Sequence, residues 1–204
     1  MTRIANSAAR TYRSELRAQQ AEETRARILD ATARVMADGL AYVSIPAVAR
    51  EAGVSVPTIY RRFATKRDLL AAMYPHFARR AGLDKLVPPR SMDELRDGVR
   101  EYFDRTDSID DLARAAMAGP ASEEVRRLNI PDRLAMFRRF ADSIEPELAE
   151  VDRDRIARLL MILTPSSALR MWRDHLGLSV DEAADEVDWI VRAAIAAATR
   201  RKKQ

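Results

Sequence analysis

The stretch SIPAVAREAGVSVPTIYRRF, from Ser44 to Phe63, decides the fold of this chain. It reads as two short helices joined by a tight turn, because each half opens on a serine N-cap with a proline in its first turn. Gly53 stands where the chain must turn, so we expect a positive φ there. Ala49 is small enough to let the two helices cross closely. A small core is expected from Ile45, Val48, Val54 and Ile59.

Flanking patterns add a helix on each side of this pair. Between residues 22 and 39 apolar side chains recur at spacings of three and four, and Gly39 is a natural stop. Downstream, Thr65 and Asp68 resemble a capping box that opens a helix carrying Leu69, Leu70, Met73 and Phe77. The three helices of residues 22–63 have the spacing of a helix-turn-helix; a generic helical hairpin within a bundle is the alternative.

The remainder of the chain also favours helices. Pro88-Pro89 is the clearest break in the pattern. Good helix formers dominate the composition, and no strand-like alternation stands out. We therefore predict an all-α fold. Beyond the break, helices are expected near residues 91–105, 109–118, 122–144 with an interruption at Pro131, 150–174 with Pro165 inside, and 179–200.

Composition narrows the class of protein. The 204 residues are 47% apolar and include no cysteine, which indicates a globular protein and excludes disulfides and zinc–thiolate sites. The N-terminal residues lack the apolar core of a signal peptide, and no run approaches the roughly 18 apolar residues of a membrane span. We therefore expect a cytoplasmic protein with no membrane partner.

Charge is divided unevenly along the chain. Residues 1–70 carry a net charge of +5, residues 71–199 carry −5, and residues 200–204 add four positive charges. A basic front third suits the binding of phosphates, because neutralised phosphates release their counterions. A chance imbalance on solvated faces is the alternative.

Enzyme motifs are missing from the sequence. It has two histidines, His76 and His175, and it shows no phosphate-cradling glycine loop, no GxSxG and no HExxH. Its carboxylates fall among arginines at the spacing of solvated helical ion pairs. We therefore expect a protein that is not an enzyme and that has no metal or cofactor.

The segment from Thr24 to Tyr74 resembles the DNA-binding region of the tetracycline-repressor (TetR) family of transcriptional regulators. The resemblance covers about a quarter of the chain and is carried by Ala49, Gly53-Val54-Ser55, Ile59-Tyr60, Phe63, Lys66 and Leu69-Leu70. It implies a helical homodimer with a DNA-binding head and a ligand-binding body that differs between members. The expected division is a basic arm over 1–21, a helix-turn-helix DNA-binding domain over 22–70, a ligand-binding and dimerisation domain over 71–199 and a basic tail over 200–204.

The resemblance also implies roles for residues in the head. Tyr60 and Lys66 are expected on backbone phosphates of double-stranded DNA, with Ser44 on a phosphate across the groove. The leading end of the recognition helix presents Val56, Pro57 and Thr58. Arg61 is the candidate reader of a guanine and Arg62 a phosphate contact, although backbone binding without specificity is open for both. Three arginines of the arm either reach a minor groove or belong to a disordered tail: Arg10, Arg13 and Arg17.

The body is expected to dimerise through two helices and to enclose a cavity. The predicted dimer interface consists of apolar residues at helical spacing: Ile156, Leu160, Leu163, Val187, Ile190, Val191 and Ala194. Burial inside one chain is the alternative. The predicted ligand contacts are methionines and aromatics with one cation, although each apolar one could equally be plain core: Phe103, Met117, Met136, Phe137, Phe140, Met161, Arg170, Met171 and Trp172.

Together these features predict a regulator, most simply a repressor that leaves a palindromic operator when a largely apolar small molecule binds. Two alternatives stay open at this stage. One is a helical scaffold with a vestigial head. The other is an activator, because the sign of regulation depends on where the operator lies.

Overall fold

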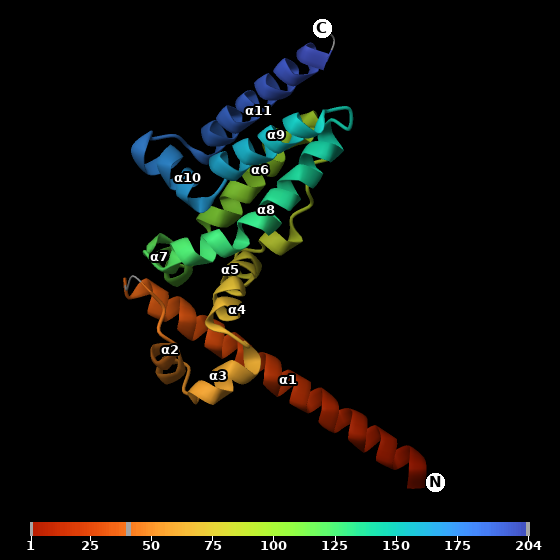
Figure 1. Cartoon of the computed structure of the whole chain (residues 1–204), viewed down its shortest axis with the longest axis vertical. Helices are drawn as coiled ribbons and strands as arrows, with labels where there is room; N and C mark the ends of the chain where they lie inside the picture. Colours follow the sequence, from red (N-terminus) through yellow and green to blue (C-terminus); the bar gives the residue numbers. More distant parts are fainter. Residues whose placement is uncertain (1, 40–41, 203–204) are drawn as a thin grey trace. The chain divides into compact units, whose positions relative to one another are not determined.

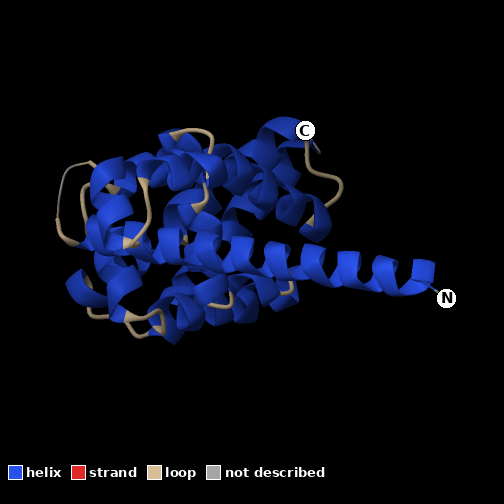
Figure 2. Ribbon diagram, turned by 90° about the horizontal axis from the view of Figure 1, so that it is seen from below, coloured by secondary structure: helices blue, strands red, loops and turns tan. Residues whose placement is uncertain are grey.

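The computed structural model describes the backbone of residues 2–39 and 42–202 and the side chains of residues 15–39 and 42–201. Within these residues every regular element is helical and no strand is present, which confirms the all-α prediction (Figure 2). The chain divides into two compact units. We call Met1–Met73 with Leu112–Val125 the head unit, and Tyr74–Asp111 with Arg126–Gln204 the body unit.

The head unit is built around one long helix. Helix α1 runs from Thr2 to Ala37, so the residues expected as a separate arm continue the first helix of the head (Figure 1). No glycine or proline interrupts this stretch, and alanine, arginine, glutamate and glutamine favour a helix. Arg17 is exposed, whereas the side chains of Arg3, Arg10 and Arg13 lie outside the described residues.

Two short helices complete the predicted helix-turn-helix, α2 (Ile45–Glu51) and α3 (Val56–Arg62), and a third, α4 (Lys66–Ala71), follows it. Gly53 has φ +64° between α2 and α3, as expected, and the Val54 amide donates to the Ala49 carbonyl at 3.0 Å. The core of the motif is apolar and nearly solvent-free, and it includes Ile28, Leu29, Val48, Ala49, Ile59, Phe63 and Leu69.

Capping residues fix where these helices begin. The Ser55 hydroxyl accepts from the Thr58 amide at the start of α3. At the start of α4, the Thr65 hydroxyl accepts from the Asp68 amide at 3.1 Å, and the Thr65 amide donates to the Asp68 carboxylate at 3.0 Å, which confirms the capping box. Ser44 occupies the N-cap position of α2, but its side chain makes no capping hydrogen bond.

The remaining elements follow the predicted order with different breaks. They are α5 (Met73–Arg80), a 3₁₀ turn (Leu83–Lys85), α6 (Met92–Asp107), α7 (Asp111–Ala118), α8 (Ser122–Ile144), α9 (Glu150–Leu163), α10 (Ser166–Arg170), a π turn (Met171–His175) and α11 (Val180–Lys202).

Three of the sequence-based boundaries were wrong. Pro131 lies inside an unbroken α8, whereas we expected an interruption there. Pro165 does end the preceding helix, so the expected helix 150–174 is three shorter elements. The helix that opens at Lys66 is broken at Ala72, which caps α4 before α5 begins.

The core of the body unit lies among α6, α8, α9 and α11. Its buried side chains include Leu95, Val99, Phe103, Ile156 and Leu160, which pack with the inner face of α11. These apolar contacts, rather than surface charges, supply most of the stabilisation of such a bundle.

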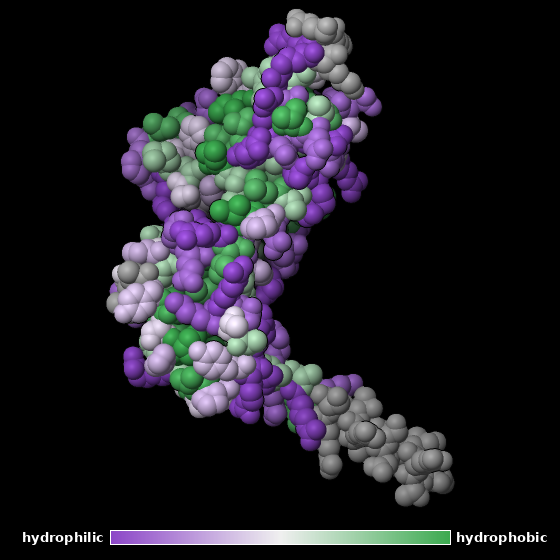
Figure 3. All heavy atoms as spheres, viewed as in Figure 1, coloured by the Kyte–Doolittle hydropathy of each residue, from purple (hydrophilic) through white to green (hydrophobic). Residues whose placement is uncertain are grey.

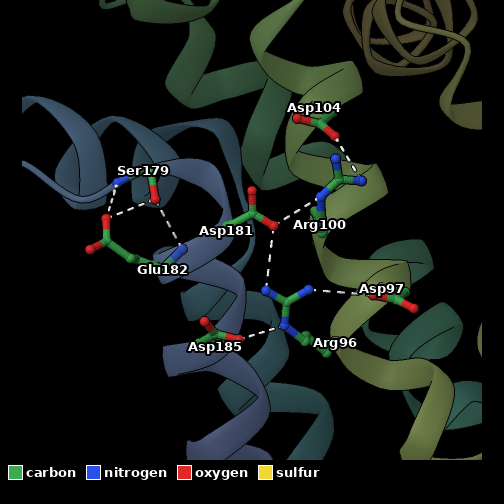
Figure 4. A network of polar contacts seen from close by, with 8 residues as sticks. All are labelled: Arg96, Asp97, Arg100, Asp104, Ser179, Asp181, Glu182 and Asp185. Atoms are coloured by element: carbon green, nitrogen blue, oxygen red, sulfur yellow. Dashed lines mark hydrogen bonds and ion pairs between the residues drawn. The ribbon is translucent and has the colours of Figure 1, made fainter.

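Ion pairs join α6 to α11 at the surface (Figure 4). Arg96 Nε lies 2.5 Å from Asp185, and Arg100 Nε lies 3.0 Å from Asp181, which Arg96 also approaches. The hydrogen bond that Arg96 donates to Asp185 raises the pKa of Arg96 above its usual range, so this cation stays charged at every accessible pH. Because the groups are exposed, they fix the register of the two helices more than they stabilise the fold.

The capping box should contribute measurably to stability. Thr65→Ala removes the hydroxyl that accepts from the Asp68 amide, so we expect the free energy of unfolding to fall by about 1 kcal/mol in chemical denaturation followed by circular dichroism. Ser44→Ala is the matched control, because the Ser44 side chain makes no capping bond, and it should cost much less. Equal losses in the two variants would contradict this account of the cap.

Candidate nucleic-acid interface

The recognition helix α3 is held rigidly from its inner side. Ile59, on the inner face of α3, is buried, and Phe63 at the end of the helix is 3% exposed. The guanidinium of Arg25, from α1, stacks over the Phe63 ring at 4.4 Å from the ring centre. Arg34 of α1 pairs with Glu51 of α2 at 2.5 Å. These contacts fix α3 against α1 and α2, so its outer face is presented in one orientation.

The outer face of α3 is cationic and contains no carboxylate. Pro57, Tyr60, Arg61 and Arg62 are exposed, while Val56 and Thr58 are partly exposed. All six predicted residues of this helix therefore reach solvent. A short helix of this kind, with polar and basic groups outward, has the chemistry needed to enter a major groove.

The guanidinium of Arg61 has a hydrogen-bond partner on its own helix. Its Nη2 donates to the Thr58 hydroxyl at 3.0 Å, and the Thr58 and Ser55 hydroxyls lie 2.9 Å apart. This chain of hydrogen bonds lays the guanidinium along the leading half of α3.

The two remaining predicted phosphate contacts differ in their surroundings. Lys66 is partly exposed, and its Nζ lies 3.8 Å from Glu124, a residue of the same unit. A phosphate at this position would replace that carboxylate as the partner of the ammonium group. Ser44 is half-buried at the start of α2, and its hydroxyl takes no part in capping.

One exposed residue escaped the sequence analysis. Tyr42 is 68% exposed and stands two residues before the N-cap of α2. The helical spacing rules do not cover it, because it lies in the loop between α1 and α2. An aromatic residue in a short interhelical loop, outside the apolar spacing of either helix, is the signal that would have revealed it.

A cavity of about 250 Å³ lies in the body unit, and three predicted ligand contacts line it: Met136, Phe137 and Phe140. Its other walls come from α5, the Leu83–Pro89 segment, α6 and α9, and include Tyr74, Ala78, Leu95, Val99, Tyr102 and Leu160. Phe103 is instead wholly buried in the core. The other predicted contacts do not line the cavity, and they are Met161, Arg170, Met171, Trp172 and, in the head unit, Met117.

The predicted dimer residues divide into two groups. Four of them are at most 2% exposed within the single chain and pack in its own core: Ile156, Leu160, Val187 and Val191. Their apolar spacing marks the inward faces of α9 and α11, so a partner cannot contact them without unpacking the body. Leu163, Ile190 and Ala194 are partly exposed. Fully outward positions on the same helices are held by Ile162 and Trp189, which are 69% and 68% exposed.

Neither a cluster of metal ligands nor a membrane-spanning helix occurs among the described residues. Within the part of the chain that the structure describes, no three histidine, aspartate or glutamate side chains are grouped as metal ligands. None of the helices described is long and apolar enough to cross a membrane.

Comparison with known proteins agrees with this geometry. Residues 28–73 match the model of bacterial regulatory proteins of the tetR family. A tetR-family transcriptional regulator from Streptomyces coelicolor has a similar fold, with a TM-score of 0.50 and 21% identity over 88% of this chain and 83% of that one. NalD, described as the secondary repressor of the MexAB-OprM multidrug efflux pump in Pseudomonas aeruginosa, has a TM-score of 0.47 and 21% identity over 86% and 96%. A comparison with curated proteins gave no match.

The helix-turn-helix and its cationic outer face define a DNA-binding protein of the transcription-regulator class. Residues 28–73 are thus similar to the DNA-binding segment of the tetR family of bacterial regulatory proteins.

Two substitutions should separate affinity from specificity. Tyr60→Phe removes an exposed hydroxyl expected on a phosphate, so it should weaken binding to all duplexes by a similar factor. Arg61→Ala removes the candidate guanine contact and should change the order of preference among sequences, at a cost of about 1–3 kcal/mol on the preferred one. Binding would be measured by fluorescence anisotropy on a panel of labelled duplexes. Equal losses on every duplex for Arg61→Ala would refute its role as a base reader.

Proposed function

We propose that this protein represses transcription by binding a palindromic operator as a homodimer, and that a small, largely apolar molecule releases it. The observation that carries the proposal is the outer face of α3, where Thr58, Tyr60 and Arg61 are presented on a helix fixed from behind. Val56 and Pro57 suit thymine methyls, and Arg62, Lys66 and Ser44 suit phosphates.

A homodimer follows from the short reach of one recognition helix. Seven residues of α3 can read only a few base pairs, so a second copy is needed for a specific site. Two copies must place their recognition helices about 34–36 Å apart to enter successive major grooves. The outward faces of α9 and α11 offer the apolar surface for pairing, and Figure 3 shows apolar side chains gathered among hydrophilic ones on the face that carries them.

Chain connectivity offers a route from ligand to DNA. The capping box at Thr65 opens α4, and α5 follows directly, with Tyr74 and Ala78 in the wall of the cavity. A ligand that binds better to a conformation with wrongly spaced heads would shift the population and lower DNA affinity. A shift from 1:99 to 99:1 needs about 5.5 kcal/mol of differential binding.

Selection of bound sequences from random duplex DNA, at near-physiological salt, tests the proposal. Enrichment of an inverted repeat with half-sites one turn apart is the expected result. No enrichment by a folded, dimeric protein would overturn it, and the scaffold interpretation would then be preferred.

Dimerisation can be tested at Trp189. This side chain is 68% exposed, so Trp189→Asp should leave the fold intact while placing a charge in the proposed interface. Sedimentation should then show dissociation at protein concentrations where the wild type is dimeric. His175→Asp, at an exposed position outside α9 and α11, is the control and should remain dimeric. A Trp189→Asp variant that stays dimeric would exclude this residue from the interface.

A further inference from the structure

A carboxylate lies beside the predicted phosphate contact Lys66. The Oε2 atom of Glu124, in the first turn of α8, is 3.8 Å from the Nζ atom of Lys66, the first residue of α4. Among the described residues, Glu124 is the only ion-pair partner of Lys66. Asp68, on α4 itself, is occupied at the cap, where its carboxylate accepts from the Thr65 amide at 3.0 Å and from the Thr65 hydroxyl at 2.9 Å. The ammonium group that is expected on DNA is therefore paired with a carboxylate of its own chain.

Packing within the head unit holds Glu124 in this position. The turn before α8 lies directly against α1, because a side chain at Gly119 would bring its Cβ to 2.9 Å from the Met36 carbonyl oxygen. The Ser122 hydroxyl donates to the Gly119 carbonyl at 2.7 Å, and Ser122 and Val125 are 2% and 4% exposed. The first turn of α8 is therefore fixed against the head by its inner side, while Glu124 is exposed on its outer side.

The pair is loose enough for a phosphate to displace Glu124. Its separation of 3.8 Å exceeds the roughly 2.7–3.2 Å of a hydrogen bond, and the two side chains are 36% and 50% exposed, so water screens the attraction. A phosphate oxygen can accept a charge-assisted hydrogen bond from the ammonium group at about 2.7–2.9 Å. The carboxylate and a phosphate carry charge of the same sign, so the two cannot both adjoin Lys66 without repulsion. A phosphate that binds Lys66 therefore has to displace the carboxylate.

We propose that Glu124 sets the affinity of the protein for DNA, because its carboxylate competes with the phosphate for Lys66 and so weakens binding. The inference rests on the proposed function in one respect, since it takes Lys66 to be a phosphate contact. It adds a residue outside the helix-turn-helix that controls the strength of binding, and it depends neither on the operator sequence nor on a ligand.

Removal of the competing charge is the first test. Glu124→Gln keeps the size of the side chain and removes its charge, so it should bind about two- to fivefold more tightly than the wild type. Affinity would be measured by fluorescence anisotropy on one labelled duplex of arbitrary sequence, because phosphate contacts do not depend on sequence. Unchanged affinity of Glu124→Gln would overturn the proposal.

A double-mutant cycle separates competition at Lys66 from repulsion of DNA at a distance. Lys66→Met removes the shared ammonium group and should weaken binding. In the Lys66→Met background, Glu124→Gln should leave the affinity unchanged within error, because no cation remains for the carboxylate to occupy. The same tightening in both backgrounds would show that Glu124 repels the duplex directly, and would refute competition.

Asp38→Asn is the matched control for loss of one negative charge from the head unit. Asp38 is exposed, stands two residues after Met36 and makes no ion pair within the described part of the chain. This variant should bind the duplex much like the wild type. A gain in affinity equal to that of Glu124→Gln would show that net charge alone is responsible, and would reject a specific role for Glu124.

Stability distinguishes an affinity-setting pair from a structural one. Because the Lys66–Glu124 pair is exposed, the unfolding temperature of Glu124→Gln in circular dichroism should be nearly that of the wild type. A large fall would show that the fold needs this pair, and would overturn its assignment to DNA binding.

Competition and DNA binding can fail separately. Binding of the duplex by the wild type, with equal binding by Glu124→Gln, would reject competition and keep the DNA-binding function. Failure of every variant to bind any duplex would reject the proposed function together with the competition. Binding by Glu124→Gln alone would support competition and show that the carboxylate suppresses DNA binding in the wild type.

Discussion

The packing of α2 and α3 against α1 is the constraint on which the head depends. Gly53 turns the chain with a positive φ, and Ala49 gives the two helices room to approach. Ile59 and Phe63, on the inner side and at the end of the recognition helix, are buried. Because these side chains fill the inner side of α3, its remaining side chains are directed toward solvent. The polar face that is proposed to meet DNA is therefore a consequence of the core behind it.

The sequence was most informative where local rules and packing agree. The capping box at Thr65, the cap at Ser55 and the turn at Gly53 each depend on residues close together in the chain, and all three were predicted. Pro131 shows the limit of such rules. A proline lacks only one hydrogen bond donor, and the packing of a long helix against its neighbours can outweigh that loss.

The interior of the body was harder to predict because apolar periodicity does not say which neighbour covers a face. Ile156, Leu160, Val187 and Val191 have the spacing of an interface, yet they face the core of their own chain. Among the cavity residues, Met136, Phe137 and Phe140 were predicted because methionine and aromatic side chains suit an apolar pocket. Tyr74 and Leu95 were not predicted, since a sequence does not say which helices enclose a cavity.

Two buried nitrogens of Arg133, in α8, have no hydrogen-bond partner among the described residues, and they bear on how long the protein survives in a cell. A cation buried with unpaired donors lowers the stability of the folded state. Cellular proteases remove the unfolded fraction, so small changes in stability alter abundance several-fold. The abundance of this protein in a cell would therefore be sensitive to any change in the surroundings of Arg133.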